Sequence, residues 1–152
     1  MTPWRTCRPD GSGATLVQIF LGALVAGLRA GLTYNTWPLM DGRFVPPAEH
    51  LLKLDPWWLN LVDNITTVQF QHRMAAYVLL ALALINALLA RQTGVARRDW
   101  AIAATVLAQV GFGIATLIYN VPLLTALAHQ AVAMIVLGMT IANVRAEYPP
   151  RS

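Results

Sequence analysis

Two of the three histidines in this 152-residue chain stand inside apolar runs. His72 lies in Val68-Gln69-Phe70-Gln71-His72-Arg73-Met74, which opens a run that continues to residue 85, and His129 lies in a second run at residues 123–134. Burying an imidazole without a partner is costly, and its nitrogens are common metal ligands. The histidine pair is therefore the main clue to function.

The composition places these histidines in a membrane protein. Hydrophobic residues make up 57% of the chain and charged residues 12%, about half the charged share of a soluble domain. A membrane-spanning helix needs about 20 apolar residues, and such segments occur at residues 14–32, 65–90, 100–119 and 123–144. Backbone in lipid must satisfy its own hydrogen bonds. We therefore predict an all-α fold, an integral membrane four-helix up-and-down bundle with one long outer loop.

Basic residues flank the apolar segments, so they indicate orientation rather than a nucleic-acid partner, despite the net charge of +4. One set occupies the two chain ends and the connection between the second and third segments: Arg5, Arg8, Arg91, Arg97, Arg98, Arg145 and Arg151. The loop between the first two segments holds only Arg43 and Lys53. The positive-inside rule then predicts cytoplasmic tails at 1–13 and 147–152, with a transmembrane module at 14–146.

A short pattern is repeated at the ends of the first and third segments. Residues 30–38 and 115–122 both carry Ala-x-Leu-x-Tyr-Asn followed by a proline, and each precedes a segment with a histidine near its start. This pattern predicts two related helical hairpins, comparable to the parallel repeats of transporters.

Under this topology the second and fourth helices run in the same direction, and the histidines lie at matched depth. His72 and His129 come roughly 9–10 Å below their helix starts at ~1.5 Å per residue. Two imidazoles without a cysteine or carboxylate do not complete a zinc site, but they suffice as the axial ligands of one haem. We predict such ligation. The alternative is that each imidazole hydrogen-bonds a neighbouring helix.

Other polar residues are interpreted around this pair. Arg29 and Arg73 lie near the level of the histidines and could pair with haem propionates, or they could extend to the lipid headgroups. His50, in the outer loop, is interpreted as a solvated side chain. Small residues such as Gly22 and Gly113 are interpreted as helix-packing residues, and the alternative is that a flat macrocycle lies against a glycine face. No Asp or Glu lies inside the four apolar runs, so acid–base catalysis at membrane depth has no candidate carboxylate.

The chain resembles the C-terminal half of haem A synthase, as found in proteobacteria and mitochondria. The likeness covers residues 14–146, and its most specific parts are Tyr34-Asn35-Thr36-Trp37-Pro38 and Phe70-Gln71-His72-Arg73. Further matching stretches are Tyr119-Asn120-Val121-Pro122-Leu123 and Ala128-His129-Gln130.

The resemblance implies an enzyme of two similar four-helix halves in the cell inner (plasma) membrane, which oxidises a methyl group of haem O to the formyl group of haem A. It implies that His72 and His129 hold a haem b that passes electrons. The substrate-processing half carries a glutamate four residues before its first histidine, and this chain has Val68 there.

The resemblance covers one half only, so activity is expected with an N-terminal half-enzyme or in a homo-oligomer. Two alternatives remain open at this point. One is a stand-alone bis-histidine b-type cytochrome that transfers electrons from a quinol, and the other is a structural membrane protein without a cofactor.

Overall fold

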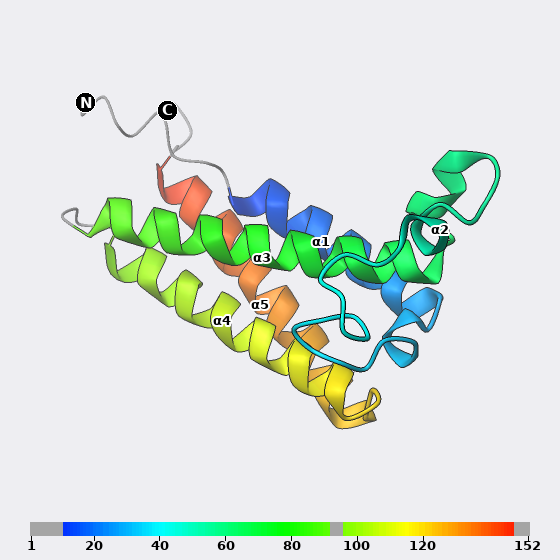
Figure 1. The fold of residues 1–152 in the computed structure, drawn as a ribbon. Coiled ribbons are helices and arrows are strands. Elements are labelled where there is room, and N and C mark those ends of the chain that lie inside the picture. Colours follow the sequence, from blue (N-terminus) through cyan, green and yellow to red (C-terminus); the bar gives the residue numbers. More distant parts are fainter. Residues whose placement is uncertain (1–10, 92–95, 148–152) are drawn as a thin grey trace.

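The computed structural model describes residues 11–91 and 96–147. Four long helices dominate it: α1 (Gly11–Gly27), α3 (Ile65–Ala90), α4 (Ala96–Ile118) and α5 (Leu123–Glu147). The shorter helices are η2 (Ala30–Leu32), α2 (Ala48–Leu51) and η3 (Trp57–Leu61). Within these described ranges no strand occurs, and the predicted all-α fold is confirmed (Figure 1).

The helix bounds agree with the sequence prediction for α3 and differ most for α1. Helix α1 begins at Gly11 and ends at Gly27, because Arg29 adopts a left-handed backbone conformation (φ 52°) and a separate 3-10 turn follows. A residue in that conformation commonly terminates a helix. Residues 11–13 of the predicted N-terminal tail therefore belong to α1, and residue 147 of the predicted C-terminal tail belongs to α5, while the rest of both tails lies outside the described residues.

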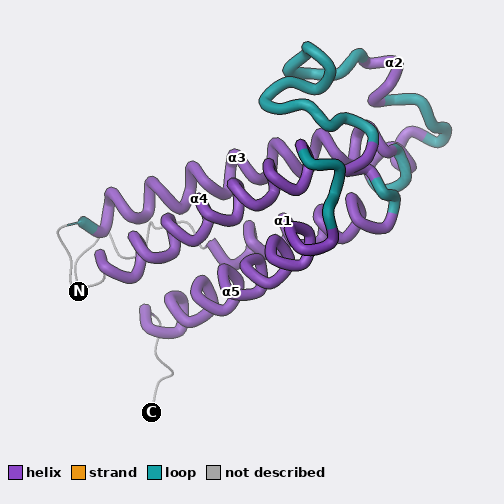
Figure 2. The backbone as a smooth tube through the Cα atoms, turned by 90° about the horizontal axis from the view of Figure 1, so that it is seen from below, coloured by secondary structure: helices purple, strands orange, loops and turns teal. Residues whose placement is uncertain are grey.

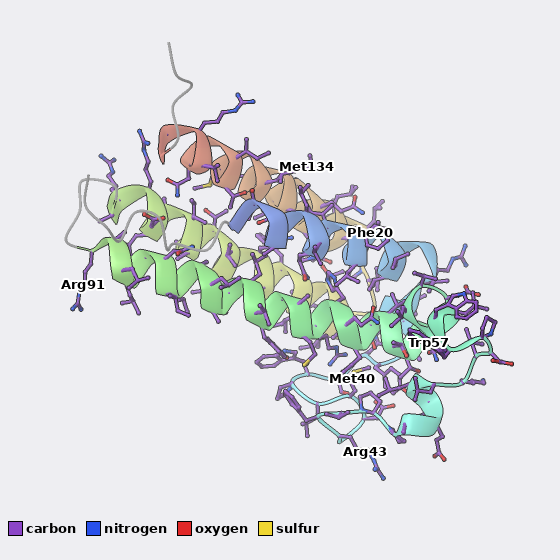
Figure 3. All side chains as sticks on the ribbon, turned by 90° about the horizontal axis from the view of Figure 1, so that it is seen from above. Phe20, Met40, Arg43, Trp57, Arg91 and Met134 are labelled. Atoms are coloured by element: carbon purple, nitrogen blue, oxygen red, sulfur yellow. The ribbon has the colours of Figure 1, made fainter. Side chains whose placement is uncertain are left out.

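Three helices, α3, α4 and α5, are long and apolar enough to cross a membrane, and α1 is a shorter apolar helix of 17 residues. Most of their surface is apolar and exposed, as lipid-facing helices require. Phe20 on α1 and Met134 on α5, both labelled in Figure 3, are 59% and 61% exposed. These features indicate a membrane protein, and they make Met134 part of the outer surface.

The four long helices form a ring in which α1 and α4 each pack against both α3 and α5 (Figures 1 and 2). Helices α3 and α5 therefore stand on one diagonal of the bundle. Diagonal helices of an up-and-down bundle run in the same direction. The fold thus sets the two histidine-bearing helices parallel and facing one another.

An apolar core fills the half of the bundle nearest the α3–α4 connection. It combines side chains from three helices: Leu79, Ala83, Ala87, Ile102, Ala103, Val106 and Val136. The alanines let the helix backbones approach closely. Both histidines lie in the other half, toward the long connection between α1 and α3, residues 28–64.

That long connection covers one end of the bundle, opposite Arg91 (Figure 3). Its Trp57 is 65% exposed, which suits a membrane interface. Asn64 joins the connection to α3: its Oδ1 caps the helix by accepting from the backbone N–H groups of Thr66 and Thr67, and its Nδ2 donates to Asn60 Oδ1 at 2.8 Å. This cap fixes where α3 begins, and with it the depth of His72.

Candidate functional site

The two intramembrane histidines meet in the interior of the bundle. The ring centroids of His72 on α3 and His129 on α5 are 6.5 Å apart, and the ring planes are inclined by 77°. Both side chains are half-buried. The structure therefore brings together the two imidazoles that the sequence sets at matched depth on different helices.

His129 is oriented by the backbone of α4. Its Nδ1 lies 3.1 Å from the carbonyl oxygen of Gln109. Because that oxygen can only accept, Nδ1 carries the proton and donates it. The other ring nitrogen, Nε2, is then an acceptor with a lone pair, which is the form that binds a metal.

His72 is oriented by a side chain of α1. The amide Nε2 of Gln18 lies 3.1 Å from His72 Nδ1 and 3.4 Å from His72 Nε2, and it donates to the backbone oxygen of His72 at 3.2 Å. The amide therefore stands at the Cε1 edge of the ring. The other amide atom, Gln18 Oε1, is buried without a hydrogen-bond partner.

Two glycines make room for these rings. A Cβ atom added at Gly113 of α4 would lie 2.9 Å from Cε1 of His129, and one added at Gly22 of α1 would lie 3.3 Å from Cε1 of His72. The first distance is closer than carbon atoms tolerate without displacement. These glycines, interpreted from sequence as helix-packing residues, also leave space for the imidazoles.

The two arginines occupy different surroundings. Arg73 is buried, and its Nη2 and Nη1 donate to the backbone oxygens of Tyr34 at 2.8 Å and Thr36 at 3.0 Å. Its Nε is buried without a partner. Arg29 is exposed at the end of α1. Arg73 thus anchors the long connection, and contact of either arginine with a propionate remains a prediction.

The centroid separation of the imidazole pair can be compared with that of a bis-histidine metal site. A metal–imidazole bond of about 2.0–2.1 Å and about 1.1 Å from that nitrogen to the ring centroid separate two centroids across one metal by about 6.2–6.4 Å. The observed separation is 6.5 Å. Across the described part of the chain, no group of three or more His, Cys, Asp or Glu side chains gathers as a metal site. Two imidazoles would be enough to hold a haem, because the porphyrin itself supplies the other ligands of the iron.

Sequence reasoning missed the residues that hold the two rings. Gln18 and Gly22 are four residues apart on α1, and Gln109 and Gly113 are four apart on α4, so each pair lies on one helix face. The shared spacing Gln-x-x-x-Gly in the two hairpins was the available signal. His50 is exposed in the long connection, in agreement with its interpretation as a solvated residue, and Val68 is fully buried.

Comparison with known proteins gives one family. A family described as cytochrome oxidase assembly protein matches residues 4–141. The haem A synthase of Methylobacterium sp. (strain 4-46) is 57% identical over 87% of this chain, and that of Beijerinckia indica subsp. indica is 55% identical over 88%. The chain spans only 38% of the length of each of these curated relatives. No solved structure gives a significant match.

Proposed function

This chain belongs to the haem A synthase family of cytochrome oxidase assembly proteins, and we propose that it is the haem b-binding C-terminal half of such an enzyme. In this proposal it takes part in the oxidation of the haem O methyl group to the formyl group of haem A. An N-terminal half-enzyme or a second copy of this chain supplies the substrate-processing site. The observation that carries the proposal is the imidazole pair, with centroids 6.5 Å apart.

The residues of this chain would hold the haem from both faces. His72 and His129 would each offer Nε2 to the iron. Nδ1 of His129 would keep its proton and donate a hydrogen bond to the Gln109 carbonyl oxygen. Gly22 and Gly113 leave the rings free of steric conflict. When bound, the haem supplies one-electron transfer.

Cations near the site suit the anionic propionates. Arg29 is exposed at the outer end of α1, and the buried Nε–H of Arg73 remains a free donor. We assign both to propionate contact within this proposal, with Arg29 the more accessible. A guanidinium pairs with a carboxylate through parallel hydrogen bonds.

The same proposal includes an orientation in the inner membrane. Arg91, Arg97, Arg98 and Arg145 belong to the helix ends that lie opposite the long connection. The positive-inside rule puts this end, and both termini, on the cytoplasmic side. The haem site then lies toward the outer leaflet.

Haem binding is tested by the reduced-minus-oxidised absorption spectrum of the purified chain. We expect a six-coordinate, low-spin b-type spectrum, and loss of that spectrum in both His72→Ala and His129→Ala because each removes one axial ligand. His50→Ala is the matched control, since His50 is exposed in the long connection. An unchanged spectrum in either intramembrane variant contradicts the assignment.

The proposed role of this chain in haem A formation is tested by a second experiment. Co-expression of this chain with an N-terminal half-enzyme in a synthase-deficient strain should yield haem A. Accumulation of haem O alone contradicts the proposal. A quinol-reducible haem in a chain that never supports haem A formation would identify a stand-alone cytochrome instead.

A further inference from the structure

The two hairpins orient their histidines from the same positions but with different chemical groups. On α1, Gln18 lies one helical turn before Gly22, and on α4, Gln109 lies one turn before Gly113. In both hairpins the glycine faces Cε1 of the histidine and the glutamine lies beside its Nδ1. The difference is that Gln109 uses its backbone oxygen and Gln18 uses its side-chain amide.

A metal-bound histidine needs an acceptor for its second ring nitrogen. Once Nε2 binds a metal, the proton must reside on Nδ1, and such a proton is nearly always given to a carbonyl, a carboxylate or water. For His129 the Gln109 carbonyl already fills this role at 3.1 Å. For His72 the polar atom recorded beside Nδ1 is Gln18 Nε2, a donor.

The amide of Gln18 holds an unused acceptor. Its Oε1 is buried and has no hydrogen-bond partner. A half-turn about the last side-chain bond exchanges the positions of Nε2 and Oε1, which are nearly equal in size. That turn presents Oε1 to the Nδ1–H of His72 and gives up the hydrogen bond from Gln18 Nε2 to the backbone oxygen of His72.

We propose that Gln18 is a positioning residue for His72, whose side-chain Oε1 accepts the Nδ1 proton when His72 Nε2 binds the haem iron. This inference rests on the proposed haem b site. Gln18 does for His72 what the Gln109 backbone carbonyl does for His129. Because a hydrogen bond to Nδ1 makes the imidazole a more basic ligand, Gln18 favours ferric over ferrous iron and lowers the reduction potential.

The midpoint potential of the haem in the full-length chain tests this role. Gln18→Leu removes the acceptor, and we expect the preference of the site for ferric over ferrous haem to fall about tenfold, which raises the midpoint potential by about 59 mV. Gln18→Glu keeps the length of the side chain and offers a stronger, anionic acceptor. It should lower the midpoint potential, and this opposite sign separates an acceptor role from a general disturbance of packing.

Two further variants make the test specific. Gln109→Leu retains the backbone carbonyl that accepts from His129. The midpoint potential of this variant should therefore stay closer to that of the unchanged chain than the midpoint potential of Gln18→Leu does. Gln130→Leu, at an exposed position beside His129, is the neutral control.

The outcomes separate this inference from the proposed function. Equal potentials in Gln18→Leu and the unchanged chain, with haem fully retained in both, overturn the role of Gln18 and leave the haem site intact. A rise in potential with Gln18→Glu overturns it as well. Absence of haem from the unchanged chain overturns the proposed function and this inference together.

Discussion

The two helical hairpins, α1 with α3 and α4 with α5, present one histidine each, yet they join their helices in different ways. The first hairpin uses a long connection, residues 28–64, that folds over the end of the bundle (Figure 2). The second turns within residues 119–122. The comparison separates the residues that orient the histidines from the residues that hold each connection in place.

The long connection depends on polar side chains supplied by α3. Arg73 donates to the backbone oxygens of Tyr34 and Thr36, and Gln69 donates to the same Tyr34 oxygen at 3.2 Å. Buried carbonyl oxygens need such donors. The connection is therefore fastened to the helix that carries His72, one residue away from the proposed iron ligand.

The short connection satisfies its backbone by local geometry. Asn120 and Val121 both adopt left-handed backbone conformations, with φ of 60° and 58°. The Val121 N–H donates to the Thr116 oxygen at 2.7 Å, which closes the end of α4. Asn35 of the first hairpin also donates to the Leu117 oxygen at 2.9 Å. The long connection is thus joined to the last turn of α4.

The largest effect is expected from removing the arginine that anchors the long connection. Arg73→Leu deletes two charge-assisted hydrogen bonds and leaves two carbonyl oxygens without these donors, which should lower the free energy of unfolding by about 2–4 kcal/mol. Denaturant titration in detergent micelles measures this. Gln130→Leu is the matched control, because Gln130 directly follows His129 and is exposed. Equal stability of the two variants would show that the long connection does not depend on Arg73.

The glycines beside the imidazoles should differ in their tolerance of a methyl group. Gly113→Ala puts Cβ at 2.9 Å from His129, whose ring is held by the Gln109 carbonyl, and we expect a loss of about 1–3 kcal/mol and weaker haem retention. Gly22→Ala, at 3.3 Å from His72, should cost less than about 1 kcal/mol. Stability and haem stoichiometry are measured together.

Each glycine has a control on its own helix. An added Cβ at Gly111 of α4 or Gly27 of α1 would meet nothing within 4 Å. Gly111→Ala and Gly27→Ala should therefore be neutral or slightly stabilising. If Gly113→Ala behaves like Gly111→Ala, the imidazole has room to move and the glycine is not required.

The sequence predicted that the two histidines lie at the same level, but it did not predict where α1 ends or how the long connection is held. Helix α3 covers its predicted apolar run, and Asn64 caps its first turn. Parallel helices of similar start then bring His72 and His129 level. The early end of α1 was missed, since hydropathy does not detect a left-handed residue at Arg29. The partners of Arg73 were missed as well, because the path of the long connection depends on tertiary contacts.

The smallest expected effect tests whether the short connection is strained. Val121 is a β-branched residue in a left-handed conformation, which costs roughly 1–2 kcal/mol for an L-residue. Val121→Gly removes that cost but adds an entropic cost of about 0.5–1 kcal/mol, because glycine loses more backbone freedom on folding. A net gain of about 0.5–1 kcal/mol in the free energy of unfolding should follow.

Asn120→Gly is the matched control for this gain. Asparagine visits the left-handed region far more readily than valine, so the adjacent substitution should leave stability nearly unchanged. Gain at Val121 alone would assign the strain to that one residue of the turn. Equal effects at both positions would show that the strain is not specific to Val121.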